Sequence, residues 1–92
     1  GCVSQTLKKG KQDFDTENYP AALQKMQPLA DKGNADAQYA VGYMMYYGKG
    51  TAINRKQGVI WINKAAAQGL PEALQAQAML VKSIQANPLE TQ

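Results

Sequence analysis

Apolar residues recur every three to four positions along most of the chain, and this spacing predicts five amphipathic helices. The expected helices cover residues 4–17, 19–33, 34–47, 54–69 and 70–86. Because the pattern never alternates with a period of two over a long stretch, no strand is expected. The pattern therefore predicts an all-α fold.

Local signals set the expected ends of these helices. The predicted N-caps are side chains with a hydroxyl or carbonyl oxygen, namely Ser4 or Thr6, Asn34 and Asn54. Gly33 and Gly69 suit the left-handed conformation that often follows a helix. Gly48-Lys49-Gly50 indicates a turn. Pro28 lies inside the second pattern and predicts a kink or a local break, since proline lacks a backbone donor.

The two halves of the chain share a repeat. Gly33 and Gly69 lie 36 residues apart (69 − 33), and at that offset Ala37 falls on Ala73 and Ala40 on Ala76. A period between about 20 and 50 residues is typical of stacked supersecondary units. We therefore expect a short helical solenoid, whose function is to present a surface.

Charge and composition exclude several functions. The chain has 92 residues and a formal charge of +3. Its basic cluster, Lys8, Lys9 and Lys11, is followed at once by Asp13 and Asp15. This mixture is typical of a solvated helix face, and a nucleic-acid site needs a clustered basic stripe. We expect no nucleic-acid partner.

Histidine is absent and Cys2 is the single cysteine. A Cys/His metal site, a Cys–His dyad and a Ser–His–Asp triad therefore cannot be built from this chain. Acidic residues could supply a carboxylate pair, but each is explained by a cap or a solvated face. We predict a protein that is not an enzyme and that uses no metal or cofactor. No apolar run reaches the roughly 18 residues of a membrane span.

The Gly1-Cys2 pair resembles the end of a bacterial lipoprotein signal, in which a small residue precedes the cysteine that becomes lipidated. The resemblance implies a lipid on Cys2, residues 1–3 as a tether and a location in the bacterial periplasm or at the outer membrane. The alternative is an ordinary cysteine in a cytoplasmic protein. Residues 87–92 are expected to be a tail.

The central stretch resembles a Sel1-like repeat, a relative of the tetratricopeptide repeat. The residues that match the repeat's motif are Ala37-Gln38, Val41-Gly42, Gly48-Lys49-Gly50, Asn54, Gly58, Trp61, Lys64-Ala65-Ala66 and Gln68-Gly69. The resemblance implies a short right-handed α-solenoid of antiparallel helix pairs and a role as an adaptor or scaffold. Residues 34–69 form the best-matching repeat, 4–33 a degenerate one and 70–86 a terminal half-repeat.

The chain departs from the family pattern at several positions. Met45 stands where the family usually has tyrosine, and Gly58 where it has alanine. Glycine inside a regular helix is expected to weaken it by about 1 kcal/mol. Gln77 and Ala78 replace a Leu-Gly pair, which is expected of a terminal helix that no further repeat covers.

The third helix carries a stripe of residues that its packing positions do not use. These are Asp36, Tyr39, Tyr43, Tyr46 and Tyr47. The resemblance to tetratricopeptide arrays places them on a concave groove, to which the first and fifth helices would add Leu7, Lys11, Phe14, Glu72, Gln75, Met79, Lys82 and Ser83. Tyrosine suits recognition because it combines apolar area with a hydroxyl group. The alternative is that Tyr39 and Tyr43 fill the core.

Two functions remain open. The first is a module that binds a protein or peptide in the tyrosine-lined groove, tethered to a membrane through Cys2. The second is self-assembly into a homo-oligomer, promoted by Leu80, Val81 and Ile84 on an uncovered fifth helix.

Overall fold

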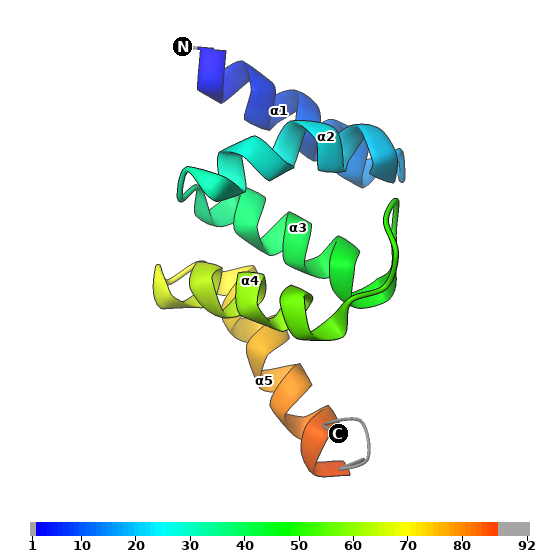
Figure 1. Ribbon diagram of the computed structural model, residues 1–92. Coiled ribbons are helices and arrows are strands. Elements are labelled where there is room, and N and C mark those ends of the chain that lie inside the picture. The colour runs from blue at the N-terminus through cyan, green and yellow to red at the C-terminus, as the bar shows by residue number, and fades with distance from the viewer. Residues whose placement is uncertain (1, 87–92) are drawn as a thin grey trace.

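The computed structural model describes the backbone of residues 2–86 and the side chains of residues 5–82 (Figure 1). Its five helices are α1 (Cys2–Asp15), α2 (Tyr19–Asp31), α3 (Ala35–Tyr47), α4 (Arg55–Ala67) and α5 (Pro71–Ala86). Residues 2–86 contain no strand, which confirms the predicted all-α fold with five helices. The predicted tail at 87–92, and the side chains of Cys2, Ser83 and Ile84, lie outside this description.

The helices stack in the order of the sequence. Each contacts the next along the chain, and the contact between α3 and α4 is the most extensive. The chain extends over 43 × 26 × 20 Å, and Figure 1 shows the row of helices running from α1 at one end to α5 at the other. This arrangement matches a short helical repeat array, in which each unit packs on its neighbours.

The expected caps of the central helices are confirmed. The Asn34 Oδ1 atom accepts a hydrogen bond from the Ala37 N–H at 2.9 Å, and the Asn54 Oδ1 atom accepts one from the Gln57 N–H at 3.2 Å. Gly33, with φ of 101°, turns the chain between α2 and α3 in the left-handed region that favours glycine. These bonds satisfy backbone donors that the first turn of a helix leaves unpaired.

Two local predictions, the cap of the first helix and a break at Pro28, were wrong. α1 begins at Cys2, so Ser4 and Thr6 lie inside the helix and do not cap it. α2 continues without a break from Tyr19 to Asp31, past Pro28. Proline removes a single backbone donor, and the helix closes beyond it because the Lys32 N–H donates to the carbonyl oxygens of Pro28 and Leu29.

The core lies between successive helices in two clusters. In the first, Met26 from α2 and Val41 and Met44 from α3 are almost entirely buried, and Trp61 from α4 packs against them. The second joins α4 to α5 through Ile62, Ala65, Ala66 and Ala73. Small residues dominate it because alanine allows two helices to approach closely.

The structure corrects the expectation that Gly58 merely weakens α4. A Cβ atom on Gly58 would lie 2.7 Å from the carbonyl oxygen of Gly42 and 2.8 Å from the backbone nitrogen of Tyr46. The backbones of α3 and α4 therefore touch at this point, and glycine is the residue that fits. Glycine has a lower helix propensity than alanine, and this loss in α4 is the cost of the close approach of the two backbones.

Candidate partner-binding groove

One side of α3 carries a row of tyrosines. Tyr39, Tyr43 and Tyr47 are spaced four residues apart, so they lie on one face of the helix, while Val41 and Met44 enter the core on the other face. The ring centroids of Tyr39 and Tyr43 are 6.3 Å apart, and those of Tyr43 and Tyr47 are 4.9 Å apart. Tyr46 extends the row, with its ring 4.9 Å from that of Tyr47.

Two aromatic residues from the first half of the chain join this row. The Phe14 ring packs edge to face against Tyr43, with centroids 5.3 Å apart, and against Tyr19 at 5.6 Å. This geometry is favourable between aromatic rings. Phe14 and all five tyrosines of the chain therefore form one continuous cluster. Tyr19 was not predicted to be part of it, since its position at the start of a helix gives no sign of its contacts.

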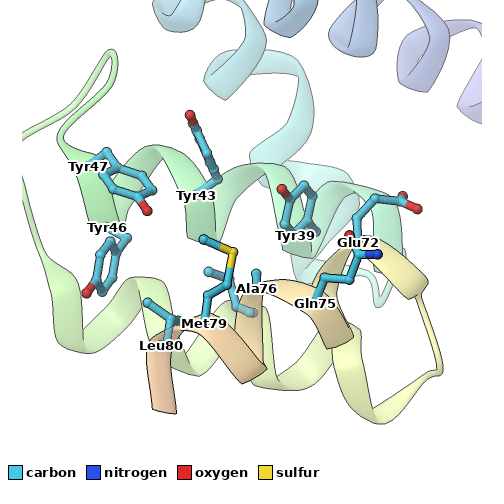
Figure 2. Close-up of a pocket in the computed structure, with 10 residues that line it drawn as sticks. Tyr39, Tyr43, Tyr46, Tyr47, Glu72, Gln75, Ala76, Met79 and Leu80 are labelled. Atoms are coloured by element: carbon cyan, nitrogen blue, oxygen red, sulfur yellow. The ribbon is translucent and has the colours of Figure 1, made fainter. Parts of the chain in front are cut away.

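A pocket of about 190 Å³ lies between α3 and α5, and we call it the tyrosine pocket. Its lining consists of Tyr39, Tyr43, Tyr46 and Tyr47 from α3, Ile62 from α4, and Glu72, Gln75, Ala76, Met79 and Leu80 from α5. Figure 2 shows Met79 reaching across the pocket toward the tyrosine row. Met79 is 66% exposed and Tyr47 51% exposed, so these apolar surfaces are open to solvent.

A second hollow of about 270 Å³ adjoins the first, and we call it the acidic pocket. It is lined by Lys11, Phe14, Asp15, Met26, Asp36, Tyr39, Ala40 and Glu72, so that Tyr39 and Glu72 border both pockets. The Lys11 ammonium lies 3.5 Å from a carboxylate oxygen of Asp36. Both side chains are substantially exposed, and such a pair contributes little to stability.

The predicted groove residues fall into three groups. Phe14, Asp36, the α3 tyrosines, Glu72, Gln75 and Met79 all lie around the tyrosine and acidic pockets. Leu7 lines a separate hollow with Gln5 and Lys8 on α1, and Lys11 lines both that hollow and the acidic pocket. Lys82 is exposed and lines none of these three hollows. Sequence reasoning missed Asp15, whose place after the apolar face of α1 gives no signal of a shared pocket.

The alternative interpretation of Tyr39 and Tyr43 as core residues accounts for part of their surroundings. Both are half-buried, and Tyr39 packs against the cluster that joins α4 to α5. Each ring nevertheless lines the tyrosine pocket, so neither is sealed beneath a neighbouring helix.

The surroundings of Tyr39 make its phenol harder to ionise. Its pKa is raised above 10.0, first by burial and then by the nearby Tyr43, Glu72 and Tyr47. The hydroxyl group, which like that of any tyrosine is protonated at neutral pH, can donate a hydrogen bond at the border of the two pockets.

Two further tests of the described residues bear on function. No group of three or more cysteine or acidic side chains in the described part of the chain is arranged to hold a metal ion. None of the helices within residues 2–86 is both long and apolar enough to cross a membrane.

Comparison with known proteins agrees with the repeat geometry. The Sel1 repeat model matches residues 35–70, which hold α3, α4 and the turn that leads into α5. A curated relative, chitin synthase regulatory factor 3 of Schizosaccharomyces pombe, is 40% identical over 76 residues. The match covers 79% of this chain and 8% of that relative, so the chain spans a small part of its length. No solved structure matches the chain. Residues 35–70 are therefore a Sel1 repeat.

Proposed function

We propose that this chain is a non-enzymatic module that binds a segment of another protein in the tyrosine pocket and its surroundings. The observation that carries the proposal is that four α3 tyrosines and Met79 of α5 line one open, largely apolar pocket (Figure 2). Exposed apolar area rimmed by polar groups is typical of a surface that binds another protein. Tyrosine is also enriched among the residues that dominate binding energy.

The relatives support the same kind of role. The Sel1 repeat is a helical repeat, and repeat arrays use extended surfaces to bind other proteins. The similar region of the yeast protein belongs to what its name describes as a regulatory factor. A binding module within a regulatory protein requires no catalytic group of its own.

The proposal is tested by blocking the pocket without disturbing the core. Peptides are first selected from a random library by the wild-type protein, and their affinities are then measured for Met79→Glu and Val81→Glu. Both side chains are exposed on α5, at 66% and 49%, and of the two only Met79 lines the pocket. We expect Met79→Glu to lose at least about tenfold in affinity, as truncated hot spots do. Equal binding by both variants would rule out the pocket.

A lipid tether on Cys2, in a bacterial periplasm or at an outer membrane, is a separate part of the proposal. It rests on the Gly1-Cys2 pair. Mass spectrometry of the protein recovered from a membrane fraction tests it, since an acylated amino terminus has a defined mass. A free thiol on the native protein would exclude the tether.

Self-assembly is a second proposal, supported by the exposed apolar residues of α5. Leu74, Met79 and Val81 are all at least 46% exposed. Sedimentation at several protein concentrations tests this role. A monomer at every concentration would exclude it.

A further inference from the structure

The tyrosine pocket borders a region of negative charge, with which it shares Tyr39 and Glu72. Asp15, Asp36 and Glu72 line the acidic pocket beside one cation, Lys11, which leaves a local charge of −2 (−3 + 1). The whole chain carries +3 and has seven acidic residues, three of which gather here. Within the described residues Lys11 pairs with Asp36, whereas Asp15 and Glu72 are in no ion pair.

We propose that the groove receives an extended segment of a partner protein that carries a lysine or arginine two residues away from an aliphatic residue or a methionine. The basic side chain occupies the acidic pocket, and the apolar one occupies the tyrosine pocket. This inference rests on the proposed function and specifies which chemistry the same surface selects.

The chemistry of each pocket selects its occupant. In the acidic pocket, a guanidinium or ammonium group meets the carboxylates of Asp15 and Glu72 and the rings of Phe14 and Tyr39. Charge-assisted hydrogen bonds and aromatic faces both favour a cation. An acidic segment would meet two carboxylates that have no ion pair of their own.

The tyrosine pocket suits a single apolar side chain. Its volume of about 190 Å³ is below the roughly 300–1,000 Å³ of pockets for drug-sized ligands. The walls contributed by Ile62, Met79 and Leu80 are aliphatic or thioether groups, and the tyrosine rings complete them. An aliphatic or methionine side chain therefore fits better than a charged one.

The distance between the pockets sets the spacing of the two residues. On α3, the acidic pocket is lined by Asp36, Tyr39 and Ala40, and the tyrosine pocket by Tyr39, Tyr43, Tyr46 and Tyr47. The centres of these two sets differ by between five and six residues, or about 8 Å along the helix. In an extended peptide, side chains two residues apart point the same way and lie about 7 Å apart.

An array of immobilised peptides tests the inference. Each peptide contains two variable residues separated by one serine within a Gly-Ser sequence, in both orders, and is probed with the fluorescently labelled protein. We expect the strongest binding where arginine or lysine is paired with leucine, isoleucine or methionine. The preference for the basic residue should weaken as salt is added, since exposed charges are screened.

Variants separate this inference from the proposed function. Glu72→Gln should lower affinity for the basic peptides about two- to fivefold, which is the contribution to affinity expected of one exposed ion pair. The charge-matched control is Asp31→Asn at the end of α2, which lines neither pocket and should leave binding unchanged.

Three outcomes decide the matter. Selection of basic–apolar pairs together with the loss in Glu72→Gln supports the inference. If acidic or neutral residues bind as well as basic ones and Glu72→Gln has no effect, while Met79→Glu still lowers affinity at least about tenfold, the inference is overturned and the proposed function stands. If no peptide binds, or if Met79→Glu binds as well as the wild type, both are overturned.

Discussion

Gly42 and Gly58 face each other where α3 and α4 touch. A Cβ atom on either glycine would lie 2.7 Å from the carbonyl oxygen of the other, closer than Cβ atoms approach backbone in real structures. A backbone carbonyl cannot rotate away as a side chain can. The pair therefore fixes how closely α3 and α4 approach.

We predict that Gly58→Ala destabilises the protein, although alanine is the better helix former by about 1 kcal/mol. The added methyl group forces α3 and α4 apart, and overpacking of this kind costs about 1–3 kcal/mol. Urea unfolding followed by circular dichroism measures the free energy of unfolding. The control is Ala67→Gly at the exposed end of α4, which reports helix propensity without a packing change. A Gly58→Ala variant more stable than wild type would contradict the close approach.

The Gln68→Ala variant should lose about 1–3 kcal/mol of stability, the cost of leaving one buried polar group unpaired. The Gln68 Nε2 atom donates to the Gly33 carbonyl oxygen and to Gln38 Oε1, both at 2.9 Å. Gln38 is buried, so its carbonyl group loses its partner in the variant.

A double-mutant cycle with Gln38→Ala checks this coupling. If the two glutamines interact as described, the effects of the single changes do not add. Strict additivity, within the error of chemical denaturation, would show that the hydrogen bond contributes nothing.

Three asparagines stand immediately before helices, and they should differ in importance. Asn34→Ala removes the hydrogen bond to the Ala37 N–H and should cost about 0.5–2 kcal/mol. Asn18 precedes α2 without any side-chain cap bond, so Asn18→Ala is the matched control and should cost much less. Thermal unfolding of the two variants compares the stability lost by Asn34→Ala with that lost by Asn18→Ala. Equal losses would mean that the cap bond is not the cause.

Stability should fall in strongly alkaline solution because of Tyr39. Its pKa is raised in the folded protein by burial and by Tyr43, Glu72 and Tyr47. The stabilisation from the neutral phenol is fully present below the unfolded value of 10.0, and it is lost as the pH rises through the folded pKa. Denaturation curves recorded across this pH range measure how steeply the free energy of unfolding falls with pH.

Tyr39→Phe tests the same assignment. Phenylalanine keeps the ring and removes the titrating group, so the variant should lose less stability than wild type between pH 10 and the folded pKa. The ultraviolet absorbance of phenolate should show one late-titrating tyrosine fewer. An unchanged pH dependence of stability would refute the role of Tyr39.

The helices and the repeat could be predicted from the sequence because their causes are local. Apolar spacing along α3 separates Val41 and Met44 from Tyr39 and Tyr43, and a cap such as Asn34 bonds a donor three residues away. A cap hydrogen bond, and the helix face on which a side chain lies, depend only on residues within one or two helical turns. The sequence by itself therefore determined the five helices, most of their ends, the Sel1 repeat at residues 35–70 and the face that carries the tyrosines.

Only the tertiary structure decided how those faces meet. The Phe14 ring packs on Tyr43, Asp15 and Glu72 line one pocket, and Gly58 touches Gly42, although each pair is distant along the chain. The predicted groove divides into a tyrosine pocket and an acidic pocket, and Lys82 lines neither. The physical reason is that such contacts depend on the distance and angle between packed helices, which depend on the shapes of side chains from several helices together.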